Sequence, residues 1–252
     1  MIEHVAVVVP AHNEQDRLPA CLDALRLARE HLRRSLLRPP TVSILVVLDD
    51  CTDDSALIVT GSRGVESVAV GVRSVGAARA AGARRVLSMM RPALSELSGV
   101  WLANTDADST VPVDWLTRMV TFAESGIEIV LGTVEPDRSE SSAQLSAEWY
   151  HRHVRHDHHP HVHGANLGIR ADTYLRLGEW DTVRSGEDVR LALRAGLAGT
   201  PVARTAAIPV RTSDRLVGRA PYGFADYLRV LQASLTDAMR LGGPAQLAER
   251  SS

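Results

Sequence analysis

The segment VAVVVPAHNE, residues 5–14, predicts the class of fold. It opens on five apolar residues, four of them valine, which are too few for a helix and favour a strand buried on both faces. The segment VSILVVL, residues 42–48, repeats this pattern. Between the two runs, apolar residues recur every three or four positions, as on one face of a helix: Leu18, Cys21, Leu22, Leu25 and Ala28. Strand, helix and strand make a βαβ unit, which predicts a parallel sheet.

The alternation of strands and helices continues beyond this unit. We expect a helix after Ser55, a strand near residues 65–70, a helix over 75–90 and strands over 100–103 and 127–131. Pro112 fits the first turn of a helix whose apolar face is Trp115, Leu116, Met119 and Val120. A helical pattern returns at Phe224, Tyr227, Leu228, Leu231 and Leu235. The sequence therefore predicts an α/β fold with a Rossmann-like, doubly wound, mostly parallel central sheet flanked by helices.

Composition narrows the functional classes. Of the 252 residues, 45% are hydrophobic and 23% are charged, as in an ordinary globular protein. The net charge is −2 and the chain has no lysine, which excludes a lysine Schiff base and a P-loop lysine. The absence of a basic balance disfavours nucleic acid as a partner.

Cysteine usage and hydropathy bear on the compartment. Cys21 and Cys51 are the only cysteines, with no CxxC spacing, and a reducing compartment suits them. No apolar run approaches the roughly 20 residues of a membrane-spanning helix. We therefore expect a cytoplasmic protein without an integral membrane segment.

Polar clusters follow three of the expected strands. They are PAHNE at residues 10–14, DDCTDD at 49–54 and NTDAD at 104–108. In open α/β sheets ligands bind beyond the carboxyl ends of the strands, so these clusters should converge on one edge. Asp106 and Asp108 lie two residues apart and can offer carboxylate oxygens to Mg²⁺ or Mn²⁺. The alternative is an ordinary turn or helix cap, where Asp-x-Asp is also common.

The order of motifs resembles family 2 glycosyltransferases with the GT-A fold. The resemblance covers about residues 5–195. It is carried by VAVVVPAHNE, ILVVLDDCTDDS, GAARAAG and NTDADS, and by HGANLGIRADTYLRLGEWD followed by SGEDVRLALRAG. It implies metal-dependent, inverting transfer of a sugar from a UDP- or GDP-type donor to a hydroxyl acceptor. The Gln-x-x-Arg-Trp signature of processive synthases is missing, which favours single transfers to a small-molecule or lipid-linked acceptor.

The resemblance also assigns residues to roles. Asp188 matches the general base and Glu187 a residue that orients the acceptor, whereas the alternative is that both cap the helix that follows. Asp106 and Asp108 match the ligands of Mn²⁺ or Mg²⁺. The implied donor-binding residues are Pro10, Ala11, His12, Asn13, Glu14, Asp49, Asp50, Arg79 and Asp106.

The acceptor side is expected after residue 110. Seven of the ten histidines lie at His151, His153, His156, His158, His159, His161 and His163. His163 precedes Gly164 and Asn166, which should border the sugar, while a solvated loop is the alternative for the whole cluster. Arg211 and Arg215, with Arg219 nearby, could clamp an anionic acceptor, or could form an ordinary solvated surface.

The expected organisation is one domain over residues 1–252. Residues 1–109 would bind the nucleotide sugar, residues 110–240 the acceptor, and residues 241–252 would form a flexible tail. Two other functions stay open, a catalytically silent nucleotide-sugar-binding scaffold and a nucleotidyltransferase. The sequence leaves the oligomeric state open, a homodimer included.

Overall fold

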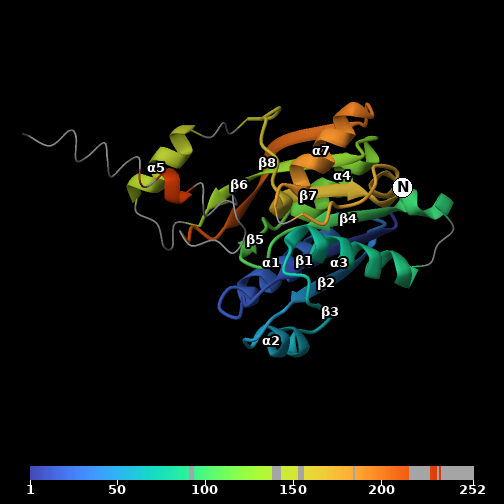
Figure 1. Ribbon diagram of the computed structural model, residues 1–252. Helices are drawn as coiled ribbons and strands as arrows, with labels where there is room; N and C mark the ends of the chain where they lie inside the picture. The colour runs from blue at the N-terminus through green and yellow to red at the C-terminus, as the bar shows by residue number, and fades with distance from the viewer. Residues whose placement is uncertain are drawn as a thin grey trace, which may run out of the picture. The chain divides into compact units, whose positions relative to one another are not determined.

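The computed structural model describes residues 1–90, 94–137, 143–152, 156–183, 185–215, 228–231 and 233. The chain divides into two compact units (Figure 1). The first comprises residues 1–136 and 155–212, and the second comprises residues 137–154 and 213–252. The predicted tail, residues 241–252, lies outside the described residues.

The first unit is built on one eight-stranded sheet with the order β3-β2-β1-β4-β7-β6-β8-β5. Its strands are β1 His4–Ala11, β2 Thr41–Asp49, β3 Glu66–Val70, β4 Val100–Asn104, β5 Ser109–Thr110, β6 Ile129–Pro136, β7 Leu167–Arg170 and β8 Val202–Thr212. The four strands β3-β2-β1-β4 are parallel. β7 runs antiparallel to both β4 and β6, so the sheet is parallel in its first half and mixed in its second.

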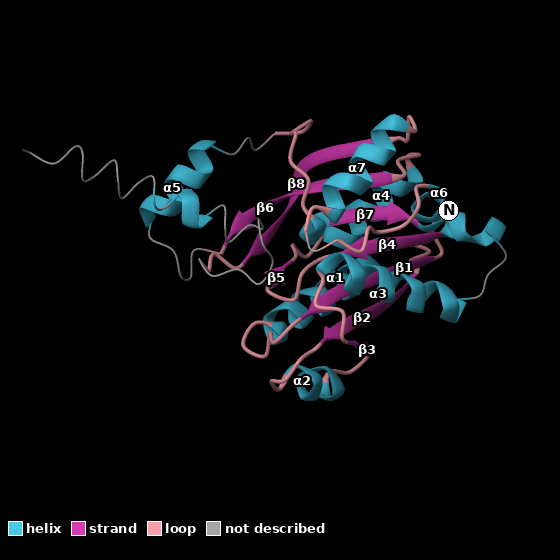
Figure 2. Cartoon of the chain, in the orientation of Figure 1, coloured by secondary structure: helices cyan, strands magenta, loops and turns pink. Residues whose placement is uncertain are grey.

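Helices cover both faces of this sheet (Figure 2). Val5, Val7 and Val9 pack with α1 (Leu18–Ser35) and α4 (Trp115–Glu124) on one face. Ala6 and Val8 pack on the other face with α3 (Val75–Met90), α6 (Ala171–Arg176) and α7 (Glu187–Leu197). Alternate residues of a strand point to opposite faces, which explains why the continuous valine run of β1 feeds two cores.

The remaining described helices are short. They are α2 Ser55–Gly61, the 3₁₀ helices η1 Leu94–Gly99 and η2 Gly164–Asn166, and α5 Ala143–Arg152 in the second unit. In that unit Trp149 packs with Leu228 and Leu231, two residues of the predicted C-terminal helical pattern. Its other positions, Phe224, Tyr227 and Leu235, lie outside the described residues. Within the described part of the chain, no helix is both long and apolar enough to cross a bilayer.

The elements expected up to residue 131 are confirmed, and α3 has the predicted bounds. One detail is wrong: Pro112 precedes α4, which begins at Trp115. The Pro112 carbonyl instead accepts a hydrogen bond from the Trp115 N–H in the turn before the helix. The elements β7, α6 and β8 were not predicted, because β7 and α6 are short and β8, although longer, has arginine, threonine and proline between its apolar residues and lacks the continuous apolar run of β1 and β2.

Gly82 of α3 lies where the helix approaches the sheet most closely. A Cβ there would lie 2.5 Å from Val8 Cγ1 and 2.8 Å from Val47 Cγ2. Both neighbours are buried β-branched side chains that have little freedom to move. We expect Gly82→Ala to lower the free energy of unfolding by about 1–3 kcal/mol, measured by urea denaturation.

Gly196 of α7 is the matched helical control. A Cβ at Gly196 meets nothing within 4 Å. Gly196→Ala should therefore raise the free energy of unfolding by about 0.5–1 kcal/mol through helix propensity alone. Equal effects of the two substitutions would contradict the packing argument.

Candidate functional site

Three polar segments leave the same edge of the sheet, as the sequence predicts. β1 pairs with β2 and with β4 in parallel register, so residues 10–14, 49–54 and 104–108 emerge together. His12 Nδ1 donates to the Asp49 carbonyl over 2.6 Å. The Asn13 side-chain oxygen accepts the Thr52 N–H over 2.7 Å. Direct hydrogen bonds thus connect the turn at residues 10–14 with the turn at residues 49–54, the two predicted donor-binding turns.

The first turn has a specific backbone geometry. Pro10 and Ala11 end β1, and Asn13 adopts a left-handed conformation with φ 54°. Asparagine tolerates this region better than most residues because its short polar side chain bonds locally. Glu14 is buried, and its N–H donates to Ser55 Oγ over 2.9 Å.

The Asp49 carboxylate organises the loop between β3 and α3. Its Oδ1 accepts the N–H groups of Val72 and Arg73 over 2.8 and 2.9 Å, and its Oδ2 accepts the Ser74 N–H over 3.1 Å. The neighbouring Asp50 accepts Arg73 Nε over 2.5 Å. Asp49 therefore holds the backbone at this sheet edge, and its contact with a nucleoside base stays a prediction.

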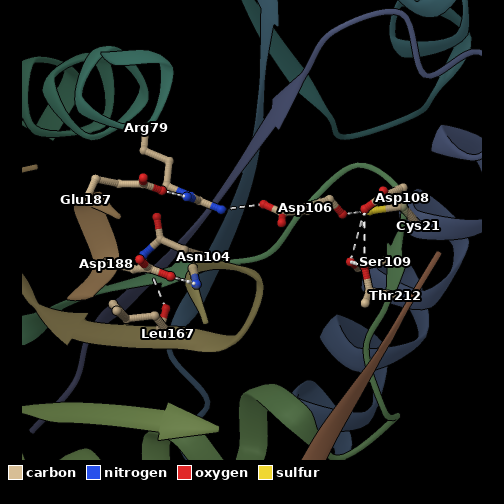
Figure 3. A network of polar contacts seen from close by, with 11 residues as sticks. Cys21, Arg79, Asn104, Asp106, Asp108, Ser109, Leu167, Glu187, Asp188 and Thr212 are labelled. Atoms are coloured by element: carbon tan, nitrogen blue, oxygen red, sulfur yellow. Dashed lines mark hydrogen bonds and ion pairs between the residues drawn. The ribbon is translucent and has the colours of Figure 1, made fainter. Parts of the chain in front are cut away.

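A buried arginine joins the donor side to the predicted catalytic residues. Arg79 of α3 is 2% exposed, and its guanidinium forms ion pairs with Asp106 and with Glu187. Figure 3 shows Arg79 between these two carboxylates. Its Cζ also lies 5.6 Å from the ring centroid of Trp180, within cation–π range. The network brings together side chains that are 27 and 108 residues apart in the sequence.

The surroundings of Arg79 are closely fitted and strongly charged. A Cβ on Gly164 would lie 2.5 Å from Arg79 Nη1, so a side chain there would displace the guanidinium from its present position. Burial alone would lower the pKa of Arg79, but Asp106, Glu187 and Asp188 together raise it. Burial raises the pKa of Glu187 against the lowering effect of Arg79. Within the described residues Arg79 Nε has no hydrogen-bond partner, which leaves one buried donor for a water or ligand oxygen.

Asp188 lies in the first turn of α7, after Gly186 in a left-handed conformation with φ 79°. Its Oδ1 accepts the Val189 N–H, and its Oδ2 accepts the Gly164 N–H, both over 2.8 Å. The carboxylate thus accepts one N–H in the first turn of its own helix and fixes the start of η2. Each oxygen keeps a second lone-pair direction, so the cap and a base function are compatible.

Asp106 and Asp108 occupy the turn after β4. The Ser109 N–H donates to the Asp106 carbonyl over 3.1 Å. Asp108 is half-buried, and its Oδ1 accepts from Ser109 Oγ over 3.3 Å and Thr212 Oγ1 over 3.4 Å. Figure 3 shows Asp108 beyond Asp106, beside Cys21.

The donor set of this turn fits a divalent cation shared with a ligand. In the described residues no three His, Cys, Asp or Glu side chains form a complete metal site. Mg²⁺ typically takes one or two carboxylates together with substrate phosphates and waters, and two aspartates satisfy that need. Burial and the carboxylates of Asp108, Asp106 and Glu14 raise the pKa of Cys21, so this thiol stays protonated. Oxygen ligands are what Mn²⁺ and Mg²⁺ prefer.

Part of the histidine cluster is packed and not solvated. The rings of His159 and His161 stack with centroids 5.8 Å apart, and those of His161 and His163 with centroids 6.0 Å apart. His159 is fully buried and its Nε2 lies 3.3 Å from the Thr205 carbonyl oxygen. Burial lowers the pKa of His159 and of His161. The solvated-loop alternative is therefore wrong for His159, while His156 and His158 are exposed.

The other predicted acceptor residues lie on different elements. Asn166 is fully buried, and its Nδ2 donates to the carbonyls of Thr133 and Ile208 over 2.8 and 2.7 Å. The Asn166 side chain therefore links β6 and β8 through two buried hydrogen bonds. Arg211 is an exposed residue of β8, and Arg215 belongs to the second unit. Arg219 and His153 lie outside the described residues.

Sequence reasoning missed two residues of this site. Trp180 contacts the Arg79 guanidinium, and Ser74 Oγ donates to the Val183 carbonyl over 2.7 Å. Trp180 lies within the LGEWD segment, and a lone tryptophan between two acids is a signal that could have marked it. Ser74 gives no such signal, because serine is common in every loop.

The family Glycosyl transferase family 2 matches residues 6–174. The undecaprenyl-phosphate 4-deoxy-4-formamido-L-arabinose transferase of Serratia proteamaculans is 32% identical over 146 residues, 58% of this chain and 41% of that protein. The protein of the same name from Salmonella choleraesuis is 31% identical over 250 residues, 93% of this chain and 67% of that protein. The chain thus spans about two fifths to two thirds of the length of these relatives.

Solved structures resemble the fold. S. aureus TarS 1-349 in complex with UDP-GlcNAc has a TM-score of 0.62 at 12% identity, covering 93% of this chain and 67% of that one. The mannosyltransferase PcManGT from Pyrobaculum calidifontis, in complex with GDP-Man and Mn²⁺, has a TM-score of 0.59 at 18% identity, covering 97% and 77%. The predicted GT-A fold is confirmed.

The three hydrogen bonds accepted by Asp49 predict a structural effect. Asp49→Ala leaves the N–H groups of Val72, Arg73 and Ser74 without their acceptor. We expect a loss of about 1–3 kcal/mol in the free energy of unfolding, and faster hydrogen exchange at these amides. The matched control is Asp54→Ala, since Asp54 is exposed and its side chain does not cap α2. Unchanged exchange at residues 72–74 in Asp49→Ala would contradict the interpretation.

Proposed function

Because the chain belongs to glycosyl transferase family 2, we propose that it moves a sugar from a UDP- or GDP-type nucleotide sugar to an acceptor. The transfer is metal-dependent, non-processive and inverting. Asp188 acts as general base toward a hydroxyl acceptor, and Glu187 positions the reacting groups. Asp106 and Asp108 hold Mn²⁺ or Mg²⁺ with the diphosphate.

The Arg79 bridge is the observation that carries this proposal. One buried guanidinium contacts Asp106, which the donor motif predicts, and Glu187, which the acceptor motif predicts. Two motifs that were assigned separately therefore meet in one network. This supports a single site in which donor and acceptor lie side by side, as direct displacement requires.

The charges of this network favour a divalent cation. Asp106, Glu187 and Asp188 surround a single guanidinium, and Asp108 follows two residues after Asp106. The carboxylates outnumber the cation, which leaves net negative charge at the place where a diphosphate must bind. A bound Mn²⁺ or Mg²⁺ would supply the Lewis acidity that stabilises a departing nucleoside diphosphate. The residues of this chain hold the carboxylates in position through Arg79 and Ser109.

Asp188 suits the base function by its position and its contacts. It is half-buried, and its carboxylate is fixed by the N–H groups of Gly164 and Val189. A fixed carboxylate can accept the proton of an attacking hydroxyl as the bond to the anomeric carbon forms. Inversion follows from this direct displacement.

The relatives favour a second acceptor chemistry. Their names give undecaprenyl phosphate, a lipid phosphate, as the group to which sugar is transferred. A phosphate oxygen is already ionised near neutral pH, so attack by it needs no general base. With such an acceptor, Asp188 would fix Gly164 and α7 without taking a proton. The two chemistries therefore differ in what Asp188 must do.

Two other functions remain as alternatives. A silent scaffold would bind nucleotide sugar without turning it over. A nucleotidyltransferase would use a nucleoside triphosphate at the same pair of aspartates. Turnover of a nucleotide sugar by the purified chain, detected as release of nucleoside diphosphate, separates the proposal from both.

Replacing the proposed base is the first functional test. Asp188→Asn keeps the acceptor oxygen for one N–H but removes the charge. We expect kcat for transfer to a hydroxyl acceptor to fall by about 10²–10⁴-fold, with donor affinity near that of the wild type. Asp172→Asn is the control, because Asp172 of α6 pairs with Arg170 of β7 and takes no part in the network of Arg79. Full activity of Asp188→Asn would place the base elsewhere or indicate a phosphate acceptor.

Metal dependence has a separate test. Thermal stabilisation by UDP, GDP and their sugars, each with and without Mn²⁺, measures donor binding through the folded state. We expect a metal-dependent rise in Tm for one base in the wild type and its loss in Asp108→Asn. Asp114→Asn is the control, because Asp114 pairs only with Arg118 at the start of α4 among the described ion pairs. Metal-independent stabilisation of both proteins would overturn the assignment of Asp108.

A further inference from the structure

The outer face of α7 carries a line of exposed aliphatic side chains. Val189, Leu193 and Leu197 follow one another at intervals of four residues, and 45%, 63% and 90% of their surfaces are exposed. Residues at this spacing lie on one face of a helix. The opposite face buries Leu191 and Ala195 in the core, so α7 is apolar on both sides. We call Val189, Leu193 and Leu197 the outer stripe of α7.

The outer stripe differs from the other exposed apolar residues of the described chain. Large exposed side chains elsewhere stand singly, such as Leu27 on α1 and Leu57 on α2. Single exposed aliphatic residues are normal on a soluble surface and need no explanation. Three in line on one short helix form a continuous apolar patch, which is typical of an interaction surface.

Positive charge borders the outer stripe. Arg190 is exposed, follows Val189 directly, and forms no ion pair within the described residues. Arg194 follows Leu193 and pairs with Asp181 over 2.6 Å. The two acids of α7, Glu187 and Asp188, lie in its first turn, where Arg79 and Gly164 engage them. An apolar line with a basic flank matches the interface of a bilayer with anionic headgroups.

We propose that the outer stripe of α7 docks on the surface of an anionic lipid bilayer. The three side chains enter the boundary between headgroups and acyl chains, and Arg190 contacts the anionic headgroups. The stripe extends about 12 Å along the helix, so α7 lies in the plane of the surface and does not span it.

This docking adds a membrane surface to the proposed function. It rests on that function in one respect, namely that the acceptor is lipid-linked. A lipid-linked acceptor presents its reacting oxygen at the headgroup level, whether that oxygen belongs to a hydroxyl or a phosphate. Val189 directly follows Asp188, so docking through the outer stripe holds the Asp188 turn next to the membrane surface. The lipid acceptor would then reach the site without leaving the bilayer.

Vesicle sedimentation with the full chain tests the surface. The probes are vesicles of phosphatidylglycerol and phosphatidylethanolamine, compared with vesicles of phosphatidylcholine alone. We expect the wild type to sediment with the anionic vesicles, and Leu193→Glu and Leu197→Glu to weaken this binding at least tenfold. Arg190→Gln should weaken it about fivefold, as loss of one basic residue near such a surface predicts. The matched control is Leu57→Glu on α2, where 70% of the leucine surface is exposed, and its binding should equal that of the wild type.

Several outcomes would overturn the proposal. They are a wild type that stays in solution with anionic vesicles, a Leu193→Glu variant that binds as the wild type does, and a Leu57→Glu variant that loses as much binding. Light scattering tests whether a second copy of the chain covers the stripe instead. If the wild type does not bind vesicles but forms a dimer that dissociates in Leu193→Glu, the stripe is a dimer interface. All substituted side chains are exposed, and an unchanged Tm confirms that the variants fold.

Donor binding separates this proposal from the proposed function. Leu193→Glu should keep the Mn²⁺-dependent rise in Tm with nucleoside diphosphate, since Leu193 is 63% exposed whereas Arg79 and Glu187 are buried. Donor binding without vesicle binding would reject the docking surface and leave the proposed function standing. Vesicle binding without any effect of nucleotide would reject the proposed function and leave the docking surface standing.

Discussion

The buried guanidinium of Arg79 is the contact on which the candidate site depends. It pairs with Asp106 after β4 and with Glu187 at the start of α7, while Trp180 lies against it. A buried charge is stable only when its partners are in place, so removing one carboxylate would leave the other groups uncompensated. This requirement ties three elements of the fold into one arrangement. Gly164 completes it, because any larger residue would occupy the space of the guanidinium.

The aspartates at this edge of the sheet differ in what their carboxylates do. Some accept hydrogen bonds from backbone N–H groups, and others are proposed to bind ligands. Asp49 is almost fully buried and holds three N–H groups of the loop before α3. Asp106 and Asp108 are partly exposed; Asp106 pairs with Arg79, and Asp108 accepts hydrogen bonds from the hydroxyls of Ser109 and Thr212. Asp49 thus differs from Asp106 and Asp108 in burial and in hydrogen bonding, so aspartates at neighbouring strand ends have different functions. The turn of Asp106 and Asp108 is the place where we propose a divalent ion.

The helix α7 carries both the proposed catalytic residues and the outer stripe. Its first turn holds Glu187 and Asp188 within the Arg79 network, and its outer stripe presents aliphatic side chains to solvent. A helix of this length is rigid, so its two faces keep a fixed relation. In our two proposals, the same helix therefore positions a reacting group and selects the surface from which the acceptor comes.

The sequence by itself determined the first half of the fold, because β1, β2 and α3 carry long apolar patterns that local propensity and periodicity predict. The resemblance of its ordered motifs to family 2 glycosyltransferases also predicted roles for Asp106, Asp108, Glu187 and Asp188, and these roles stay predictions. Only the tertiary structure revealed that Arg79 pairs with both Asp106 and Glu187, that the buried Asn166 side chain links two strands, and that His159 is packed in the interior. The physical reason is that burial and ion pairing arise between residues far apart in the chain, and no local pattern records which partner a side chain will meet.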